Sequence, residues 1–402
     1  MKLPFFVKND EKRIALLFVS FFSYNLITLF VNVLVSFVWP GTPLDTAMCM
    51  AVYALFIISA IEPICKRISI VGILFPFFVF LLYVLHGIVF PSNEEELVGY
   101  MPEFLFTVLP LFLLGGAIRD YKVIAEYFEK ASRYVICIAF TYYMIIQIAG
   151  LEITEDNMSF AYYLLPFSVM NVYSLVHKFS LGNLLTMMLA LYVHLLAGTR
   201  GPLLCIVVSI VLFVYFNKIK AKTKLVWMVI LIGFLIFLSS DLSIELLQNL
   251  QEFFQSNGVN SRILEKFLDQ TLMDDSGRAV IRETLITAMQ ERPLVGYGLM
   301  GDRVILSGSY AHSLIYELMI DFGIVGGLAI FAILAAMLAK GLLGNKISKH
   351  QKIILVCLCS CVFVKLFFSG SYLREPSFFL LLGMLFQKRK QKPQPTNRIG
   401  SN

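Results

Sequence analysis

The feature that most constrains this chain is a succession of apolar blocks, almost free of charge, that are long enough to cross a lipid bilayer. A crossing helix takes roughly 20 apolar residues, and a backbone in lipid must satisfy its own hydrogen bonds, so such blocks predict helices. We count about twelve, at residues 14–38, 46–61, 70–90, 101–118, 133–149, 160–176, 182–197, 202–216, 225–240, 312–339, 351–369 and 373–387. The sequence therefore predicts an all-α, polytopic membrane protein in which residues 1–402 form a single membrane domain.

Composition supports the same fold class. Hydrophobic residues make up 58% of the 402 residues and charged residues 15%, whereas soluble chains have about 45–50% and about 25%. The first apolar block follows Lys8, Lys12 and Arg13, but it is about twice as long as the apolar core of a signal peptide, and no small-residue cleavage site follows it. We interpret it as an uncleaved first membrane helix.

The seven cysteines offer no framework for crosslinks or metal binding. Six lie in apolar blocks, Cys65 lies in a predicted turn, and none lies in the long polar connection described below. This distribution predicts neither a disulfide framework nor a zinc site. We therefore expect no metal and no cofactor.

Basic residues alternate between the two sides of the predicted membrane. One set of connections holds Lys66, Arg67, Arg119, Lys122, Lys130, Arg133, Lys178, four lysines between 218 and 224, Lys340, Lys346, Lys349 and Lys352. The opposite short connections hold only Arg200 and Arg374. Because cytoplasmic connections carry the excess of basic residues, the count predicts a multi-pass protein of the inner (cytoplasmic) membrane with both termini in the cytoplasm.

The C-terminal tail at residues 388–402 is basic, and we expect it to be disordered in the cytoplasm. A basic segment beside a membrane helix is attracted to anionic lipid headgroups. The tail contributes to the formal net charge of +6. That charge therefore indicates orientation in the membrane and not a nucleic-acid partner.

The longest connection, residues 241–311, lies outside the membrane on the side away from the cytoplasm according to the same count. Apolar residues recur there at helical spacing, which predicts amphipathic helices at about 242–254, Ser261–Leu272 and Gly277–Arg292. A merely solvated connection would need no apolar stripes, so we expect it to fold back onto the membrane surface. After it a new helix opens at His312, and Phe322-Gly323 interrupts that helix.

Arginines and one histidine gather on this outer side. Arg278 and Arg282 stand four residues apart on the third predicted helix and Arg303 follows, while Arg200 lies at the lip of another helix pair. A guanidinium donates two parallel hydrogen bonds to phosphate oxygens and keeps its charge. Several arginines at a membrane lip, beside His312, therefore predict a phosphate held at headgroup depth.

A resemblance to a known family is carried by four short motifs. They are Gly198-Thr199-Arg200-Gly201, Arg278-x3-Arg282, Glu291-Arg292-Pro293-Leu294-Val295-Gly296-Tyr297-Gly298, and Ala311-His312-Ser313-Leu314-Ile315-Tyr316-Glu317-Leu318 leading into Gly323-Ile324-Val325-Gly326. This succession resembles the O-antigen ligase and Wzy-type polysaccharide polymerase superfamily, in blocks at about 198–215 and 277–330. One departure is Ser313, because the family often has asparagine after the histidine.

The resemblance implies an inverting, metal-independent glycosyl transfer. The implied donor is a glycan on undecaprenyl diphosphate at the outer leaflet, whose anomeric carbon is attacked by an acceptor sugar hydroxyl. In a polymerase the acceptor is another lipid-linked repeat unit, and in a ligase it is the lipid A core. We favour the polymerase, which makes O-antigen, capsular or exopolysaccharide, because the connection is modest in length and the sequence outside the two blocks looks variable. A chain-length regulator and a flippase are expected partners.

The resemblance also suggests a role for individual residues. Arg200 and Arg278 are the first choices for holding the diphosphate. Arg282 is the next candidate, and Arg303 and Arg374 rank after it. His312 is the favoured general base, because an imidazole is neutral near pH 7.

Glu317, about 140° around the helix from His312, is expected to orient a loop arginine. Tyr310 and Tyr372 could stack on sugar rings.

Plain structural explanations compete with these assignments. Basic residues at helix ends often snorkel toward headgroups, which would account for Arg303 and Arg374. We expect packing or snorkelling for His86, His194 and Lys365. At the level of function, a lipid flippase or transporter is the main rival, but coupled transport normally places carboxylates within the spans, and these spans have few. A membrane scaffold would not gather arginine with histidine on one side.

Overall fold

The computed structural model describes residues 9–38, 44–149, 157–197, 199–216, 278–344 and 347–386, together with isolated positions between 224 and 256. The described residues are helical or in turns, and they include no strand. The predicted amphipathic helices at 242–254 and Ser261–Leu272 and the basic tail at 388–402 lie outside these ranges, apart from isolated positions in the first. Most of the second half of the predicted apolar block at 225–240 also lies outside these ranges.

The first half of the chain supplies most of the long helices. They are α1 (Asp10–Val38), α2 (Leu44–Cys65), α3 (Ile70–Val89), the short η2 (Pro91–Asn93), α4 (Glu94–Glu103), η3 (Phe104–Val108), α5 (Leu109–Ala117), α6 (Tyr121–Ala149), α7 (Asn157–His177), α8 (Leu181–Leu196) and α9 (Arg200–Phe216). The remainder are α13 (Arg278–Glu291), α14 (Gly301–Ile305), α15 (Leu314–Leu343), α16 (Lys349–Leu358), η4 (Cys359–Phe363), η5 (Lys365–Phe367) and α17 (Pro376–Phe386).

Within the described residues, eight helical segments are long and apolar enough to cross a membrane, and α8, α9 and α17 are shorter apolar helices. Together they account for every predicted apolar block except 225–240. The prediction of an all-α, multi-pass membrane protein is therefore confirmed.

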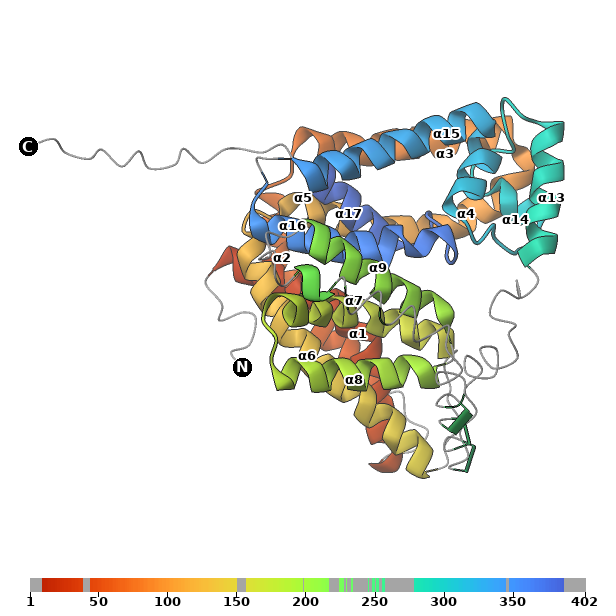
Figure 1. Ribbon diagram of the computed structural model, residues 1–402. Coiled ribbons are helices and arrows are strands. Elements are labelled where there is room, and N and C mark those ends of the chain that lie inside the picture. The colour runs from red at the N-terminus through yellow and green to blue at the C-terminus, as the bar shows by residue number, and fades with distance from the viewer. Residues whose placement is uncertain are drawn as a thin grey trace, which may run out of the picture.

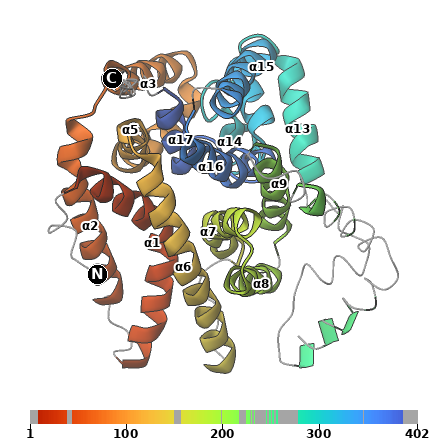
Figure 2. The same ribbon diagram turned by 60° about the vertical axis from the view of Figure 1, so that its left-hand side comes forward.

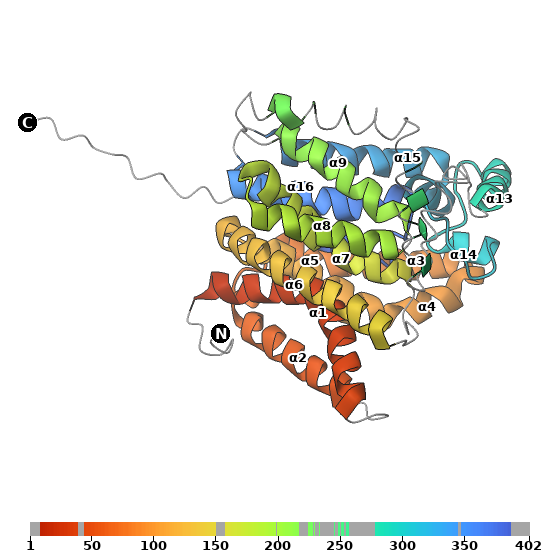
Figure 3. The ribbon, with the colours of Figure 1, turned by 60° about the horizontal axis from the view of Figure 1, so that its bottom comes forward.

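The helices differ greatly in how much protein surrounds them. In α7, 83% of the membrane-length window is buried inside the protein, whereas the value is 6% in α3 and 17% in α15. Figure 2 shows α16 and α17 between α3 and α15 above and α7 below, and Figure 3 shows α7, α8, α9 and α16 running side by side. Large side chains such as Phe77 (68% exposed) and Ile88 (71%) cover the outside of α3. Such apolar exposure suits contact with lipid.

Two glycines bring α17 close to α5. A Cβ added at Gly115 would lie 2.2 Å from the Leu380 carbonyl oxygen, and one at Gly383 would lie 2.1 Å from the Phe112 carbonyl oxygen. Small residues allow helix backbones to approach this closely in membrane proteins. The contact fixes α17, and with it the connection at 368–375 that precedes it.

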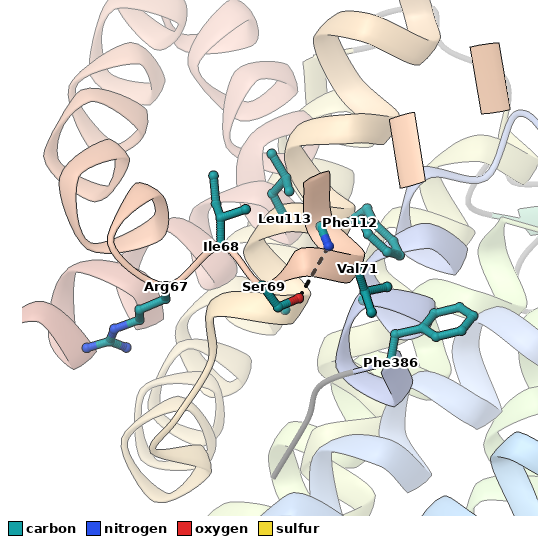
Figure 4. A pocket seen from close by; sticks show the side chains of 10 residues that line it. Arg67, Ile68, Ser69, Val71, Phe112, Leu113 and Phe386 are labelled. Atoms are coloured by element: carbon teal, nitrogen blue, oxygen red, sulfur yellow. Dashed lines mark hydrogen bonds between the residues drawn. The ribbon is translucent and has the colours of Figure 1, made fainter. Parts of the chain in front are cut away.

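Basic connections meet at one end of the bundle. Arg67 in the α2–α3 turn pairs with Glu11 at 2.8 Å, and Arg13 pairs with Glu62 at 3.4 Å. The Asp120 amide, in the α5–α6 turn, donates to Glu11 at 3.2 Å. The small pocket in Figure 4 also lies here, between Arg67 and Phe386 at the C-terminal end of α17. The grouping of these connections agrees with the charge count, and their orientation toward the cytoplasm stays a prediction.

The helix predicted at Gly277–Arg292 is present as α13, and it crosses the opposite end of the bundle (Figure 1). Its buried stripe of Leu285, Ala288 and Met289 packs with Ala311 and Ile320. The interruption predicted at Phe322-Gly323 is confirmed, because Gly323 has φ 73° and ψ 166° inside α15.

Candidate functional site

The connection between α13 and α15 is held by the kink in α15. Gly323 breaks the helical hydrogen bonding there, so the carbonyls of Ile320 and Asp321 accept from the amides of Tyr297 (2.7 Å) and Gly298 (3.1 Å). A Cβ at Gly296, whose φ is 71°, would lie 2.4 Å from the Ile320 oxygen. Only glycine fits so close a backbone approach at positive φ. The glycines of the Pro293–Gly298 segment thus allow its backbone to approach and hydrogen-bond to α15.

The same connection is also anchored to α3 and η2. The Asn93 amide donates to the carbonyl oxygens of Tyr297 (2.7 Å) and Leu299 (3.0 Å). The Leu299 amide donates to Nδ1 of His86 at 2.8 Å. His86, for which packing or snorkelling was expected, accepts a hydrogen bond that fixes this connection. The segment that carries Arg303 and His312 is therefore held from two sides.

Six residues from three segments form a buried cluster that we call the carboxylate network. They are Asp302, Arg303, Glu317, Asp321, Ser371 and Tyr372. Arg303, 2% exposed, donates to Asp302 Oδ1 at 2.6 Å, to Glu317 Oε1 at 3.4 Å and to Ser371 Oγ at 2.6 Å. Its guanidinium is thus engaged by protein groups, as a buried charge must be to offset its lost hydration.

The remaining contacts of the network bind the 368–375 connection to α15. Glu317 accepts from the Ser371 hydroxyl through Oε1 and from the Tyr372 amide through Oε2 at 3.0 Å. The Tyr372 hydroxyl donates to Asp321 Oδ2 at 2.7 Å. Burial raises the pKa of Asp302, while the adjacent Arg303 opposes the rise.

The network also fixes the backbone next to His312. Asp302 Oδ2 accepts from the Ala311 amide at 2.9 Å. His312 itself has φ 52°, a left-handed conformation that is unfavourable for a residue other than glycine and needs support from its surroundings. The ring of Tyr310 lies against the imidazole, with centroids 3.9 Å apart. The strained turn is therefore held on both sides of Ala311.

The imidazole of His312 is suited to accept a proton. It is partly buried, and its Nδ1 has no hydrogen-bond partner among the described residues. Burial lowers the pKa of His312, and the positive charge of Arg278 lowers it further. Arg278 is thus close enough to act on the imidazole, and the neutral form is favoured near pH 7.

Positively charged residues from separate segments surround two tyrosines. Burial raises the pKa of Tyr310, and the charges of Lys365 and Arg278 both oppose that rise. Lys365 Nζ lies 4.7 Å from the ring centroid of Tyr162. A Cβ at Gly201, next to Arg200 at the start of α9, would lie 2.1 Å from the hydroxyl of Tyr162. We call Arg278, Lys365 and Arg200, which directly precedes Gly201, the cationic group.

The other residues expected at the site have different surroundings. Arg282 lies one turn after Arg278 on α13 and is exposed. Arg374 forms a long ion pair with Glu103, at 3.9 Å, and half of its side chain is exposed. Arg303 and Glu317 belong to the carboxylate network. Tyr372 belongs to it as well, and its hydroxyl donates to Asp321.

Sequence reasoning did not identify Asp302, Asp321 and Ser371, nor the ion pair between Lys365 and Glu375. One signal was available, because Glu317 and Asp321 stand four residues apart on an otherwise apolar helix and thus share a face. Contacts such as that between Arg303 and Ser371 join residues far apart in sequence, and no local pattern predicts them.

The comparison with protein families agrees with the geometry. No curated protein matches the chain. The family described as O-antigen ligase matches residues 185–331, which run from α8 into α15 and include Arg200, Arg278 and His312 but not Lys365 or the 368–375 connection. This segment is therefore similar to the O-antigen ligase family, in agreement with the resemblance seen in its motifs.

Proposed function

We propose that the protein is a glycosyltransferase that polymerises undecaprenyl-diphosphate-linked repeat units at the outer face of the cytoplasmic membrane. The observation that carries the proposal is the position of His312 beside the positive charge of Arg278. Its imidazole has a lowered pKa and an Nδ1 that has no hydrogen-bond partner in the part of the chain that the structure describes. A base next to fixed cations is what glycosyl transfer from a lipid diphosphate requires. The family match to residues 185–331 supports the same class of substrate.

The reaction is a single displacement with inversion. An acceptor hydroxyl attacks the anomeric carbon of the donor sugar and gives its proton to His312. The bond between that carbon and the diphosphate oxygen breaks, and the lipid diphosphate leaves with the bonding electron pair. Arg278 and Arg200 stabilise the negative charge that develops on the leaving group. Guanidinium groups supply the positive charge here, so the proposal uses no metal ion.

The remaining residues have supporting roles in this proposal. Arg303 and Glu317 hold the turn of His312 through the carboxylate network, and Tyr310 fixes the imidazole by packing against it. Arg282 and Arg374 are exposed at the same end of the bundle. They are placed to contact headgroups or the glycan rather than the reacting atoms.

Membrane vesicles with a lipid-linked repeat unit provide the test. Arg200→Ala, Arg278→Ala and His312→Ala should each reduce chain extension to a small residual rate while the protein stays inserted. Arg133→Ala is a matched control, because Arg133 lies on α6 in an exposed pair with Glu129. Normal extension in all three site variants would overturn the proposal. A flippase would instead leave repeat units on the cytoplasmic leaflet.

The ligase is the second candidate, because the matched family is described as O-antigen ligase. The two activities differ in their acceptor, and surface polysaccharide from a deletion strain separates them. Single repeats on the final acceptor indicate loss of a polymerase, and free lipid-linked polymer indicates loss of a ligase. A chain-length regulator and a flippase are the partners we expect for a polymerase.

A further inference from the structure

Lys365 is a charged residue whose side chain is largely buried. It lies in η5, at the end of the apolar segment Lys349–Phe367, and its side chain is 17% exposed. Its ammonium pairs with Glu375, whose side chain is 14% exposed. A lysine at membrane depth is costly and usually serves a function or meets a partner.

The surroundings of Lys365 connect it with the proposed diphosphate site. Its ammonium lies over Tyr162, whose hydroxyl contacts Gly201 at the start of α9. Its charge also acts on Tyr310, together with that of Arg278. Lys365, from a segment separate from α13, therefore approaches two tyrosines on which the charge of Arg278 also acts.

Glu375 has other groups that stabilise its charge when Lys365 moves away. It accepts a hydrogen bond from the Ser377 hydroxyl. It also directly precedes Pro376, the first residue of α17, and a carboxylate is favoured near the N-terminus of a helix. A lysine is a compact charge on a flexible stem. The pair can therefore open without leaving an unsupported carboxylate.

We propose that Lys365 is a third cationic ligand of the lipid diphosphate, held by Glu375 until the diphosphate binds. The inference rests on the proposed function and adds a ligand from outside the matched segment 185–331. When substrate is absent, Glu375 neutralises the ammonium. When substrate is bound, the phosphate oxygens replace Glu375, and Ser377 continues to donate to that carboxylate.

A binding experiment tests this with farnesyl diphosphate as the probe and the full-length protein in detergent. Lys365→Met should weaken binding roughly tenfold to a hundredfold, the effect of losing one hydrogen bond between charged groups. Glu375→Gln should bind the probe more tightly, because it removes the competing carboxylate. The double variant Lys365→Met/Glu375→Gln should bind as weakly as Lys365→Met.

A purely structural ion pair predicts a different pattern. Removing one partner of a closed pair is costly, whereas replacing both by apolar residues is often neutral. Both single variants would then lose binding and thermal stability together, and Lys365→Met/Glu375→Leu would recover both. That recovery, or unchanged binding by folded Lys365→Met, would overturn the proposal. If Lys365→Met does not fold, tighter binding by Glu375→Gln still supports the proposal, and weaker binding contradicts it.

Arg278→Ala separates this inference from the proposed function. If Arg278→Ala weakens binding of farnesyl diphosphate and Lys365→Met does not, the inference about Lys365 alone fails. If neither variant weakens it, the diphosphate site itself is wrong. Gel filtration and thermal unfolding of each variant show whether the folded protein is being compared.

Discussion

The carboxylate network and the cationic group lie at the same end of the bundle but have opposite charge balances. In the network, Asp302, Glu317 and Asp321 surround one guanidinium, and all four side chains are at most 2% exposed. In the cationic group, positive charge predominates, and Arg200 and Arg278 are partly exposed. The network engages its guanidinium with protein groups, whereas we propose that the cationic group binds the lipid diphosphate.

In the proposed function, this difference separates the residues that hold the site from those that contact substrate. A buried charge engaged by several protein groups has little capacity left for a ligand, and breaking its contacts costs stability. A partly exposed arginine near a base can bind an anion without rearrangement of the core. Arg303 and Arg278 lie on the neighbouring helices α14 and α13 and carry the same charge, yet Arg303 is buried among carboxyl groups and Arg278 is partly exposed.

The largest effect is expected from His312. His312→Ala removes the proposed base and should lower the rate of chain extension about a hundredfold to ten-thousandfold. Binding of farnesyl diphosphate should change little, because the arginines remain. His350→Ala, at the basic end of the bundle, is the matched control and should keep its rate. Extension by His312→Ala within tenfold of the unaltered protein would show that another group takes the proton.

The next effect is a loss of stability in the network. Arg303→Ala leaves buried carboxyl groups without their guanidinium and should lower the free energy of unfolding by about 3–5 kcal/mol. The measurement is unfolding by denaturant in detergent, with Arg133→Ala as the control for an exposed pair. If Arg303→Ala unfolds like that control while its KM for lipid-linked donor rises, Arg303 binds substrate and the comparison between the two regions is wrong.

A smaller effect concerns the dependence of the rate on pH. Because burial and Arg278 lower the pKa of His312 below its ordinary value, the base stays neutral until the pH falls below that value. The rate should therefore fall on acidification with a midpoint below 6.5, the ordinary pKa of histidine. Arg278→Lys keeps a positive charge and serves as the control.

Arg278→Ala removes one cause of the lowering, so its residual rate should fall at a higher pH than that of Arg278→Lys. Rate profiles of both variants from pH 5 to 8 provide the measurement. An identical midpoint in the two variants would show that the charge of Arg278 does not reach the imidazole during turnover.

The sequence predicted the membrane helices because lipid imposes a length and an apolar composition on each crossing. It also predicted α13, whose stripe of Leu285, Ala288 and Met289 follows helical periodicity. His312 and Arg278 were found through motifs that precede or begin helices. These features are local, so a window of neighbouring residues contains the whole signal.

The contacts of the carboxylate network could not be predicted from a window of neighbouring residues. Arg303 meets Ser371, 68 residues away, and Glu317 meets the same hydroxyl from 54 residues away. From sequence, Arg303 was a candidate phosphate ligand and Lys365 a snorkelling residue, because a charge pattern does not show which partner a side chain meets. The contact between α5 and α17 holds the 368–375 connection where Ser371 meets Arg303.

The smallest effect is expected from Arg374, an exposed arginine that belongs to neither the carboxylate network nor the cationic group. Its pair with Glu103 is long, at 3.9 Å, and the side chains are 51% and 37% exposed. Exposed pairs contribute about 0.2–1 kcal/mol, so Arg374→Ala should change stability by no more than that. Its binding of farnesyl diphosphate should stay within severalfold of the unaltered protein.

Arg374→Ala is informative because Arg374 directly precedes Glu375 in the connection that bears both ion pairs. A tenfold or greater loss of farnesyl diphosphate binding would place Arg374 among the ligands, since that is the effect of losing a hydrogen bond between charged groups. In that case the exposure of a side chain would not distinguish ligands from surface residues. The position of Lys365 near Tyr162 and Tyr310 would then no longer be a reason to single it out as a ligand. If only Lys365→Met weakens binding, position around these two tyrosines is what selects the residues that hold the diphosphate.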